Sequence, residues 1–195
     1  MGKSWENIYV GQVEQGERAW EGKSIAAVAR LRGEDPWTTF FELSARFRVN
    51  VNPESMDERQ KRLALAAPFV ALCTDSEPLD PARATGAHPR AFGAFPRLLA
   101  RYVREEHVLG LEDAVRRMTS LAANRLSLRD RGRIAPGMAA DLVVFDPDTI
   151  QDTATFTAPI SLPRGIDYVI VNGQVAMDHG RWTGAKAGQL LRPQR

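Results

Sequence analysis

The spacing of apolar residues predicts mainly helices in the first half of the chain, with two short strands between them. Residues 5–13 predict a strand, and a helical pattern follows over residues 21–47. Within it, Asp35-Pro36 has the residue types of a helix cap and a first helical turn, so the region should hold two helices. The charged segment 54–65 predicts a further helix, and the apolar run 69–73 predicts a buried strand.

Two amphipathic helices are the clearest local signals, and they follow a loop rich in proline, glycine and alanine. The apolar positions of the first are Phe95, Leu98, Leu99, Tyr102 and Val103, with Pro96 near its start. Those of the second are Leu111, Ala114, Val115, Met118, Leu121 and Ala122. Spacings of three and four residues put each set on one helix face, so both helices should pack that face against a core.

Beyond Arg131-Gly132 the pattern changes to that of strands. The three strand-like segments are 140–147, 166–173 and 174–180. Asn172-Gly173, between the last two, is the pair favoured in a two-residue hairpin turn. The chain should therefore have a helix-rich part followed by a small β part.

Composition and charge exclude several classes of partner. The 195 residues are 44% hydrophobic and 26% charged, with a formal net charge of +2. Acidic and basic residues are mixed, and the helical spacing of Arg97, Arg101 and Arg104 is typical of a solvated stripe, so we expect no nucleic-acid partner. No apolar run approaches the roughly 18 residues of a membrane span, and the N-terminus lacks a signal-peptide core. We therefore expect a cytoplasmic chain without membrane contacts.

Three features that can indicate chemistry have simpler interpretations. The segment GERAWEGKS at 16–24 resembles a phosphate-binding loop, but it has five residues instead of four between its first glycine and its Gly-Lys pair. The single cysteine, Cys73, allows no intramolecular disulfide and is expected to be a small buried apolar residue. His107 and His179 lack the spacing of metal ligands, so we expect both at the surface.

Asp75 is the best candidate for chemistry on local grounds. It follows the apolar run, which would put its carboxyl group at the carboxyl end of a strand, where α/β folds collect ligands and catalytic groups. The alternative is a turn that Asp75 caps together with Thr74 and Ser76. His88 and Arg90 lie in the next loop, where substrate contacts are common, and an arginine fits a carboxylate by two-point contact. An exposed loop arginine without a role is the alternative there.

Three segments carry a resemblance to a known family. They are HPRAFGAFPRLLARYVREE at 88–106, LEDAVRRMTSLAANRLSLRDRGRIAPGMAADLVVFDPDTI at 111–150 and GIDYVIVNGQVAMDHGRWTGAKAGQLLR at 165–192. They are similar to the C-terminal part of the N-acyl-D-amino-acid deacylases, the D-aminoacylase-type members of the amidohydrolase superfamily. GMAADLVVFDP is common to many amidohydrolases, whereas the run after His88 and RRMTSLAANRL are more particular to this family.

The resemblance implies a metal-dependent enzyme that hydrolyses the amide bond of an N-acyl-D-amino acid to a D-amino acid and a carboxylate. The implied fold is α/β: the C-terminal portion of a (β/α)8 barrel with a helical insertion over 1–126, and a small β-sandwich-forming segment over 127–195. Asp75 aligns with the family's proton-transferring acid and Arg90 with the arginine that binds the substrate's α-carboxylate. His88 belongs to the same substrate-binding loop.

The implied metal is zinc, and most of its ligands should lie outside this chain. The family's His-x-His pair and middle-strand ligands are missing from the sequence, and a catalytic zinc needs about three protein ligands. Asp75 is the one candidate ligand that this chain offers. The family usually has Ser-Asp-Gly where this chain has Thr74-Asp75-Ser76, and the missing glycine changes the turn that aims the carboxylate.

We therefore expect a segment of an amidohydrolase that is inactive alone. A complete barrel takes about 250 residues, more than this chain has, and whether Met1 is the biological start stays open. The alternatives are a truncated, non-catalytic relative and a complementing subunit whose partner chain carries the histidines, each acting as an interaction module. Uncovered strand edges and apolar helix faces would favour pairing with an N-terminal barrel half or self-association.

Overall fold

The computed structural model describes residues 4–193, which form two compact units. The first unit contains the chain up to Asp57 together with Asp75–Gly93 and Ala154–Ser161. The second unit contains Glu58–Thr74, Ala94–Thr153 and the chain from Leu162 onward. Each unit has a hydrophobic core of its own. The division into 1–126 and 127–195 expected from the sequence refers to a barrel and a sandwich, and it stays a prediction.

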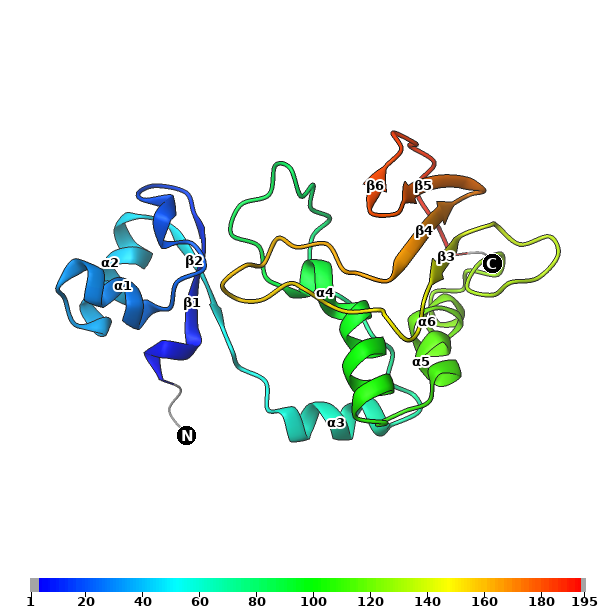
Figure 1. Ribbon diagram of the computed structural model, residues 1–195, viewed down its shortest axis with the longest axis horizontal. Coiled ribbons are helices and arrows are strands. Elements are labelled where there is room, and N and C mark those ends of the chain that lie inside the picture. Colours follow the sequence, from blue (N-terminus) through cyan, green and yellow to red (C-terminus); the bar gives the residue numbers. More distant parts are fainter. Residues whose placement is uncertain (1–3, 194–195) are drawn as a thin grey trace. The chain divides into compact units, whose positions relative to one another are not determined.

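Two antiparallel strands form the sheet of the first unit (Figure 1). A short 3-10 helix, η1 (Trp5–Asn7), leads into β1 (Ile8–Val13), which pairs with β2 (Val49–Pro53) so that Val10 lies opposite Val51. The strand expected within 5–13 is confirmed. β2 was not expected, because its alternation of valine with asparagine is a weak strand signal.

Helices cover the core of the first unit, and their ends follow the capping rules. The helices are the 3-10 helix η2 (Arg18–Trp20), α1 (Ile25–Arg32) and α2 (Pro36–Arg46). The Asp35 carboxylate accepts hydrogen bonds from the N–H groups of Trp37 and Thr38, which confirms the predicted cap. The core residues are Val10, Val13, Trp20, Ile25, Val28 and Leu43.

The helices of the second unit pack their apolar faces together, as their periodicity predicted. They are α3 (Glu58–Ala66), α5 (Leu111–Met118), α6 (Ser120–Arg125) and the π-helix η3 (Leu98–Glu105), into which α4 (Arg90–Arg97) continues. Pro96 lies inside α4 and has no N–H to donate, and the π-type hydrogen bonding begins two residues later. The buried cluster comprises Leu98, Leu99, Tyr102, Ala114 and Ile150.

Buried and partly buried arginines bind α3 and the residues after it to the other helices of the second unit. Arg117, whose side chain is 3% exposed, donates hydrogen bonds of 2.6 Å and 2.7 Å to the carbonyl oxygens of Leu65 and Ala67. Arg62 forms a bidentate ion pair with Glu106, with contacts of 2.7 Å and 3.0 Å. These bonds fix the end of α3, from which the chain continues toward Asp75.

A four-stranded antiparallel sheet completes the second unit. Its strands, in sheet order, are β3 (Leu142–Phe145), β4 (Ile166–Val171), β5 (Gln174–Asp178) and β6 (Arg181–Trp182). Asn172 and Gly173 have φ values of 46° and 80°, the left-handed conformation that a tight hairpin turn requires, so the predicted hairpin is confirmed.

Two expectations about the middle of the chain are wrong. No strand forms over 69–73, and the described chain between Ala67 and Pro89 has no helix or strand. An apolar run becomes a strand only where a neighbouring strand takes its backbone hydrogen bonds, and none of the strands within residues 4–193 does so here. For the same reason Cys73 is exposed and not buried. The mixed α and β content is confirmed, while the barrel and the sandwich stay predictions. No helix among residues 4–193 is long and apolar enough to cross a membrane.

Candidate functional site

The structure brings the candidate acid and the candidate arginine together. Asp75 lies in an irregular segment, in the left-handed conformation with φ of 48°. Its Oδ2 atom is 3.1 Å from Nη1 of Arg90, and the two side chains are 79% and 44% exposed. The carboxylate is thus held by an ion pair at the surface of the first unit and not by the end of a strand.

His88 fixes the backbone of Arg90 at the start of α4. The N–H of Arg90 donates a hydrogen bond of 3.1 Å to Nδ1 of His88. The first N–H groups of a helix lack partners within it, so the imidazole satisfies one of them as a side-chain cap. Because Nδ1 accepts this bond, the neutral ring must carry its proton on Nε2.

The ring of Phe156 contacts the imidazole of His88. The ring centroids of His88 and Phe156 are 5.1 Å apart at an interplanar angle of 76°, and Phe156 in turn stacks on Tyr9 at 5.0 Å and 15°. Burial lowers the pKa of His88 from its ordinary value, the guanidinium of Arg90 lowers it further, and Asp75 opposes the shift. The lowered pKa favours the neutral ring, the form in which Nδ1 can accept a hydrogen bond.

A close backbone approach holds the loop that carries these residues against β1. Gly86 has a φ of 58°, and a Cβ atom at this position would lie 2.1 Å from the backbone N of Gln12 and 2.4 Å from the carbonyl carbon of Gly11. Only glycine allows this contact. Gly86, two residues before His88, thereby fixes the loop after Asp75 to β1.

The described residues do not by themselves fit a metal centre. Among residues 4–193, no group of three or more His, Cys, Asp or Glu side chains could hold a metal ion. His107 is exposed, as expected. His179 is also exposed, and its Nδ1 lies 2.6 Å from Asp178, whose carboxylate raises the pKa of the imidazole. That Asp75 is a metal ligand stays a prediction.

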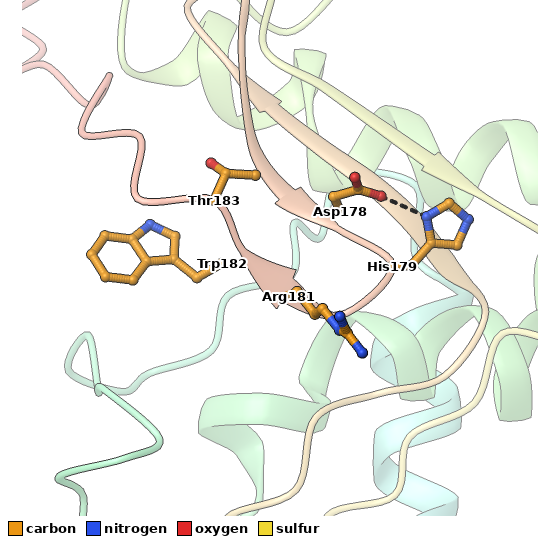
Figure 2. Close-up of a pocket in the computed structure, with 5 residues that line it drawn as sticks. All are labelled: Asp178, His179, Arg181, Trp182 and Thr183. Carbon is orange, nitrogen blue, oxygen red and sulfur yellow. Dashed lines mark hydrogen bonds and ion pairs between the residues drawn. The ribbon is translucent and has the colours of Figure 1, made fainter.

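Two hollows in the described part of the chain have linings that do not include Asp75 or Arg90. The first, on the hairpin of β5 and β6 (Figure 2), is lined by Asp178, His179, Arg181, Trp182 and Thr183. The second, in the first unit, is lined by Glu6, Tyr9, Glu21, Gly22, Lys23, Ser24, Ala27 and Thr157. Tyr9 connects this second hollow to the rings beside His88.

The sequence pointed to Asp75, His88 and Arg90, which contact one another in the structure, but it gave no sign of Phe156 and Gly86. Phe156 comes from a loop far downstream, and Gly86 contacts a strand far upstream. No local pattern marks either residue, since both act through contacts between distant segments. A glycine in a loop signals only that backbone freedom is available.

Comparison with known proteins identifies the family. A family model described as "Amidohydrolase family" matches residues 4–177. The chain belongs to the amidohydrolase family. It is similar to a D-aminoacylase of Alcaligenes xylosoxydans xylosoxydans, with 38% identity over 170 residues that cover 87% of this chain and 34% of the relative. An N-acyl-D-aspartate deacylase of the same organism is 41% identical over 138 residues, which cover 71% of this chain and 27% of the relative.

Solved structures agree with this amidohydrolase assignment. A D-aminoacylase with a binuclear metal centre has a TM-score of 0.81 at 34% identity, covering 95% of this chain and 37% of that one. The N-acyl-D-glutamate deacylase of Bordetella bronchiseptica, complexed with zinc and a phosphonate that mimics the tetrahedral intermediate, has a TM-score of 0.73 at 34% identity, covering 96% and 36%. The resemblance to N-acyl-D-amino-acid deacylases is confirmed, and the chain spans about a third of the length of the curated relatives.

Proposed function

We propose that this amidohydrolase chain supplies the acid and the carboxylate clamp of a site that hydrolyses N-acyl-D-amino acids to a D-amino acid and a carboxylate. The relatives support the reaction class, since they are named D-aminoacylase and N-acyl-D-aspartate deacylase. The observation that carries the proposal is the 3.1 Å contact between Asp75 and Arg90. It joins a proton-transfer group and an anion-binding group in one place.

Arg90 is the proposed clamp for the α-carboxylate of the substrate. Its guanidinium presents a planar set of donors that can bind two carboxylate oxygens at once. When substrate binds, its α-carboxylate takes the place of the Asp75 carboxylate beside Nη1. His88 keeps the backbone of Arg90 in place during this exchange, because its Nδ1 bonds to the main-chain N–H and not to the guanidinium.

Asp75, once released from Arg90, is the proposed general acid and base. Amide hydrolysis requires a proton on the leaving amine, and a carboxyl group within hydrogen-bond reach can deliver it. Zinc is the proposed cofactor, by analogy with the zinc complex of the related deacylase. The described residues offer it at most Asp75 and do not form a site for it, so the remaining ligands would come from residues outside this set.

The test is turnover of N-acyl-D-amino acids in two proteins. The 195-residue chain with added zinc should show none. A chimera, in which this chain replaces the matching third of the Alcaligenes D-aminoacylase, should be active. In the chimera, Asp75→Asn should lower kcat by about 100-fold or more, the usual contribution of general acid–base catalysis. Arg90→Lys should raise KM about tenfold with a smaller effect on kcat, since it loses two-point binding.

Matched controls come from the same loop. Asp80→Asn and Arg83→Lys make the same chemical changes at exposed positions of the first unit and should leave both constants unchanged. An Asp75→Asn chimera that keeps full turnover would remove Asp75 from the reaction. An Arg90→Lys variant with an unchanged KM would remove Arg90 from substrate binding. Turnover by the chain alone would overturn the expectation that it is inactive.

A further inference from the structure

A ring from a distant segment contacts the candidate site. Phe156 lies between Tyr9 of β1 and His88, stacked on the first and edge-to-face with the second, at centroid distances of 5.0 Å and 5.1 Å. The three rings come from the three separate segments that make up the first unit. Aromatic pairs in these two geometries are favourable beyond their apolar contact, so the arrangement of the rings is specific.

The turn that carries Phe156 is itself fixed. The N–H of Thr155 donates to the carbonyl oxygen of Ala158 at 3.1 Å, and the N–H of Ala158 donates to Oγ1 of Thr155 at 3.0 Å. Gly22 packs closely on the same turn, because a Cβ atom there would lie 2.8 Å from the carbonyl oxygen of Thr157. Phe156 is therefore presented by an anchored turn, and its ring stacks on that of Tyr9.

The contact between the rings of Phe156 and His88 bears on the position of Arg90. A single hydrogen bond at Nδ1 leaves the imidazole of His88 free to rotate about its terminal torsion, which is a broad, soft coordinate. The ring of Phe156 limits that rotation. It thereby keeps Nδ1 directed at the N–H of Arg90, the residue with which α4 begins and whose side chain pairs with Asp75.

We propose that Phe156 is a positioning residue of the candidate site: through His88 it fixes the start of α4 and hence the side chain of Arg90 beside Asp75. This inference rests on the proposed function for its meaning in catalysis. The geometry itself can be tested on the chain as it is, without substrate, metal or turnover. Phe156 would act on Arg90 through the imidazole that its ring contacts.

The experiment is NMR spectroscopy of the 195-residue chain and three variants. In the unaltered chain, the ¹⁵N shift of His88 should show an unprotonated Nδ1, and the amide of Arg90 should be protected from hydrogen exchange. Phe156→Leu keeps apolar bulk but removes the ring. It should shift His88 toward a mixture of tautomers and speed exchange of the Arg90 amide about fivefold, as expected for the loss of one hydrogen bond.

Two further variants separate positioning from general packing. Phe156→Tyr keeps the ring and should restore both signals. Phe41→Leu, an equivalent change at an exposed ring of α2, should alter neither. His179, in the second unit, is an internal reference whose shifts should stay constant.

Several results would overturn the proposal. The most direct would be a Phe156→Leu variant in which the tautomer of His88 and the hydrogen exchange of the Arg90 amide are unchanged. If this variant fails to fold, the unaltered chain still decides, since the absence of a nuclear Overhauser effect between the rings of Phe156 and His88 would contradict the contact. Failure of the proposed function would appear instead as unchanged turnover of the Asp75→Asn chimera, with these NMR signals intact.

Discussion

Replacing Gly86 by alanine should disrupt the first unit far more than the same change at another glycine. Gly86 and Gly33 both belong to this unit and both have positive φ, 58° and 67°. They differ in their surroundings. A Cβ at Gly86 would meet the backbone of Gln12 at 2.1 Å, whereas nothing lies within 4 Å of a Cβ at Gly33.

The structure sets the expected magnitudes. The left-handed conformation costs alanine about 1 kcal/mol at either position. At Gly86 the contact is with main-chain atoms of Gly11 and Gln12, which lie between the paired residues Val10 and Val13 of β1, and overpacking against backbone costs about 1–3 kcal/mol more. Gly33→Ala should therefore destabilise the unit by about 1 kcal/mol and Gly86→Ala by about 3 kcal/mol. The difference of about 2 kcal/mol corresponds to about 30-fold in the opening equilibrium.

Hydrogen exchange can measure this difference within one unit. The chain has two units, so a single global unfolding free energy is not well defined. The better reporters are the amides of Val10 and Gly22, because the Val10 N–H donates to the carbonyl oxygen of Lys23 and the Gly22 N–H donates to that of Val10, both at 2.8 Å. The hydrogen exchange of these two amides should be about 30-fold faster in Gly86→Ala than in Gly33→Ala. Equal protection in the two variants would refute the close contact between the loop and β1.

Two further predictions concern the second unit. Arg117→Met should cost about 2–3 kcal/mol, because it leaves the carbonyl oxygens of Leu65 and Ala67 without their buried donor. Arg116→Met, at a 39% exposed neighbour that also pairs with Asp113, should cost less than about 1 kcal/mol, and similar losses of hydrogen-exchange protection in the helices of the second unit would contradict this reasoning. Arg62 and Arg101 lower the pKa of Glu106 to about 2, from an ordinary value of 4.5. Since the folded pKa is depressed, the stabilisation is complete above pH 4.5 and is lost as the pH falls toward 2. Glu106→Gln should flatten the pH dependence of stability in that range, and parallel curves for the two proteins would count against the ion pair.

The elements that the sequence predicted well are those with local causes. The cap at Asp35 depends on a side chain and the two N–H groups that follow it closely, and the hairpin at Asn172-Gly173 depends on two backbone conformations. The amphipathic helices required only a regular spacing of apolar residues. In each case the residues that decide the structure are close together in the sequence.

The errors come from contacts between distant residues. The run at 69–73 has the composition of a strand, but a strand needs a neighbour, and its composition says nothing about whether one is present. Asp75 was expected at a strand end, and it lies instead in a left-handed turn conformation. Phe156 and Gly86 carry no local signal of their contacts with His88 and β1, so only the three-dimensional structure shows them.

The exposure of the ion pair decides whether Asp75 and Arg90 can have the roles proposed for them. A buried pair would resist separation, because each charge left without its partner would be costly. An exposed pair is worth only about 1 kcal/mol or less, since water replaces either partner. At 79% and 44% exposure, these side chains belong to the second class. In the proposed function, a substrate carboxylate that makes two charge-assisted hydrogen bonds to Arg90 would displace a carboxylate held by one contact, and this exchange would free Asp75 for proton transfer. The salt bridge is therefore compatible with the proposed roles because it is weak, and added salt should weaken it further.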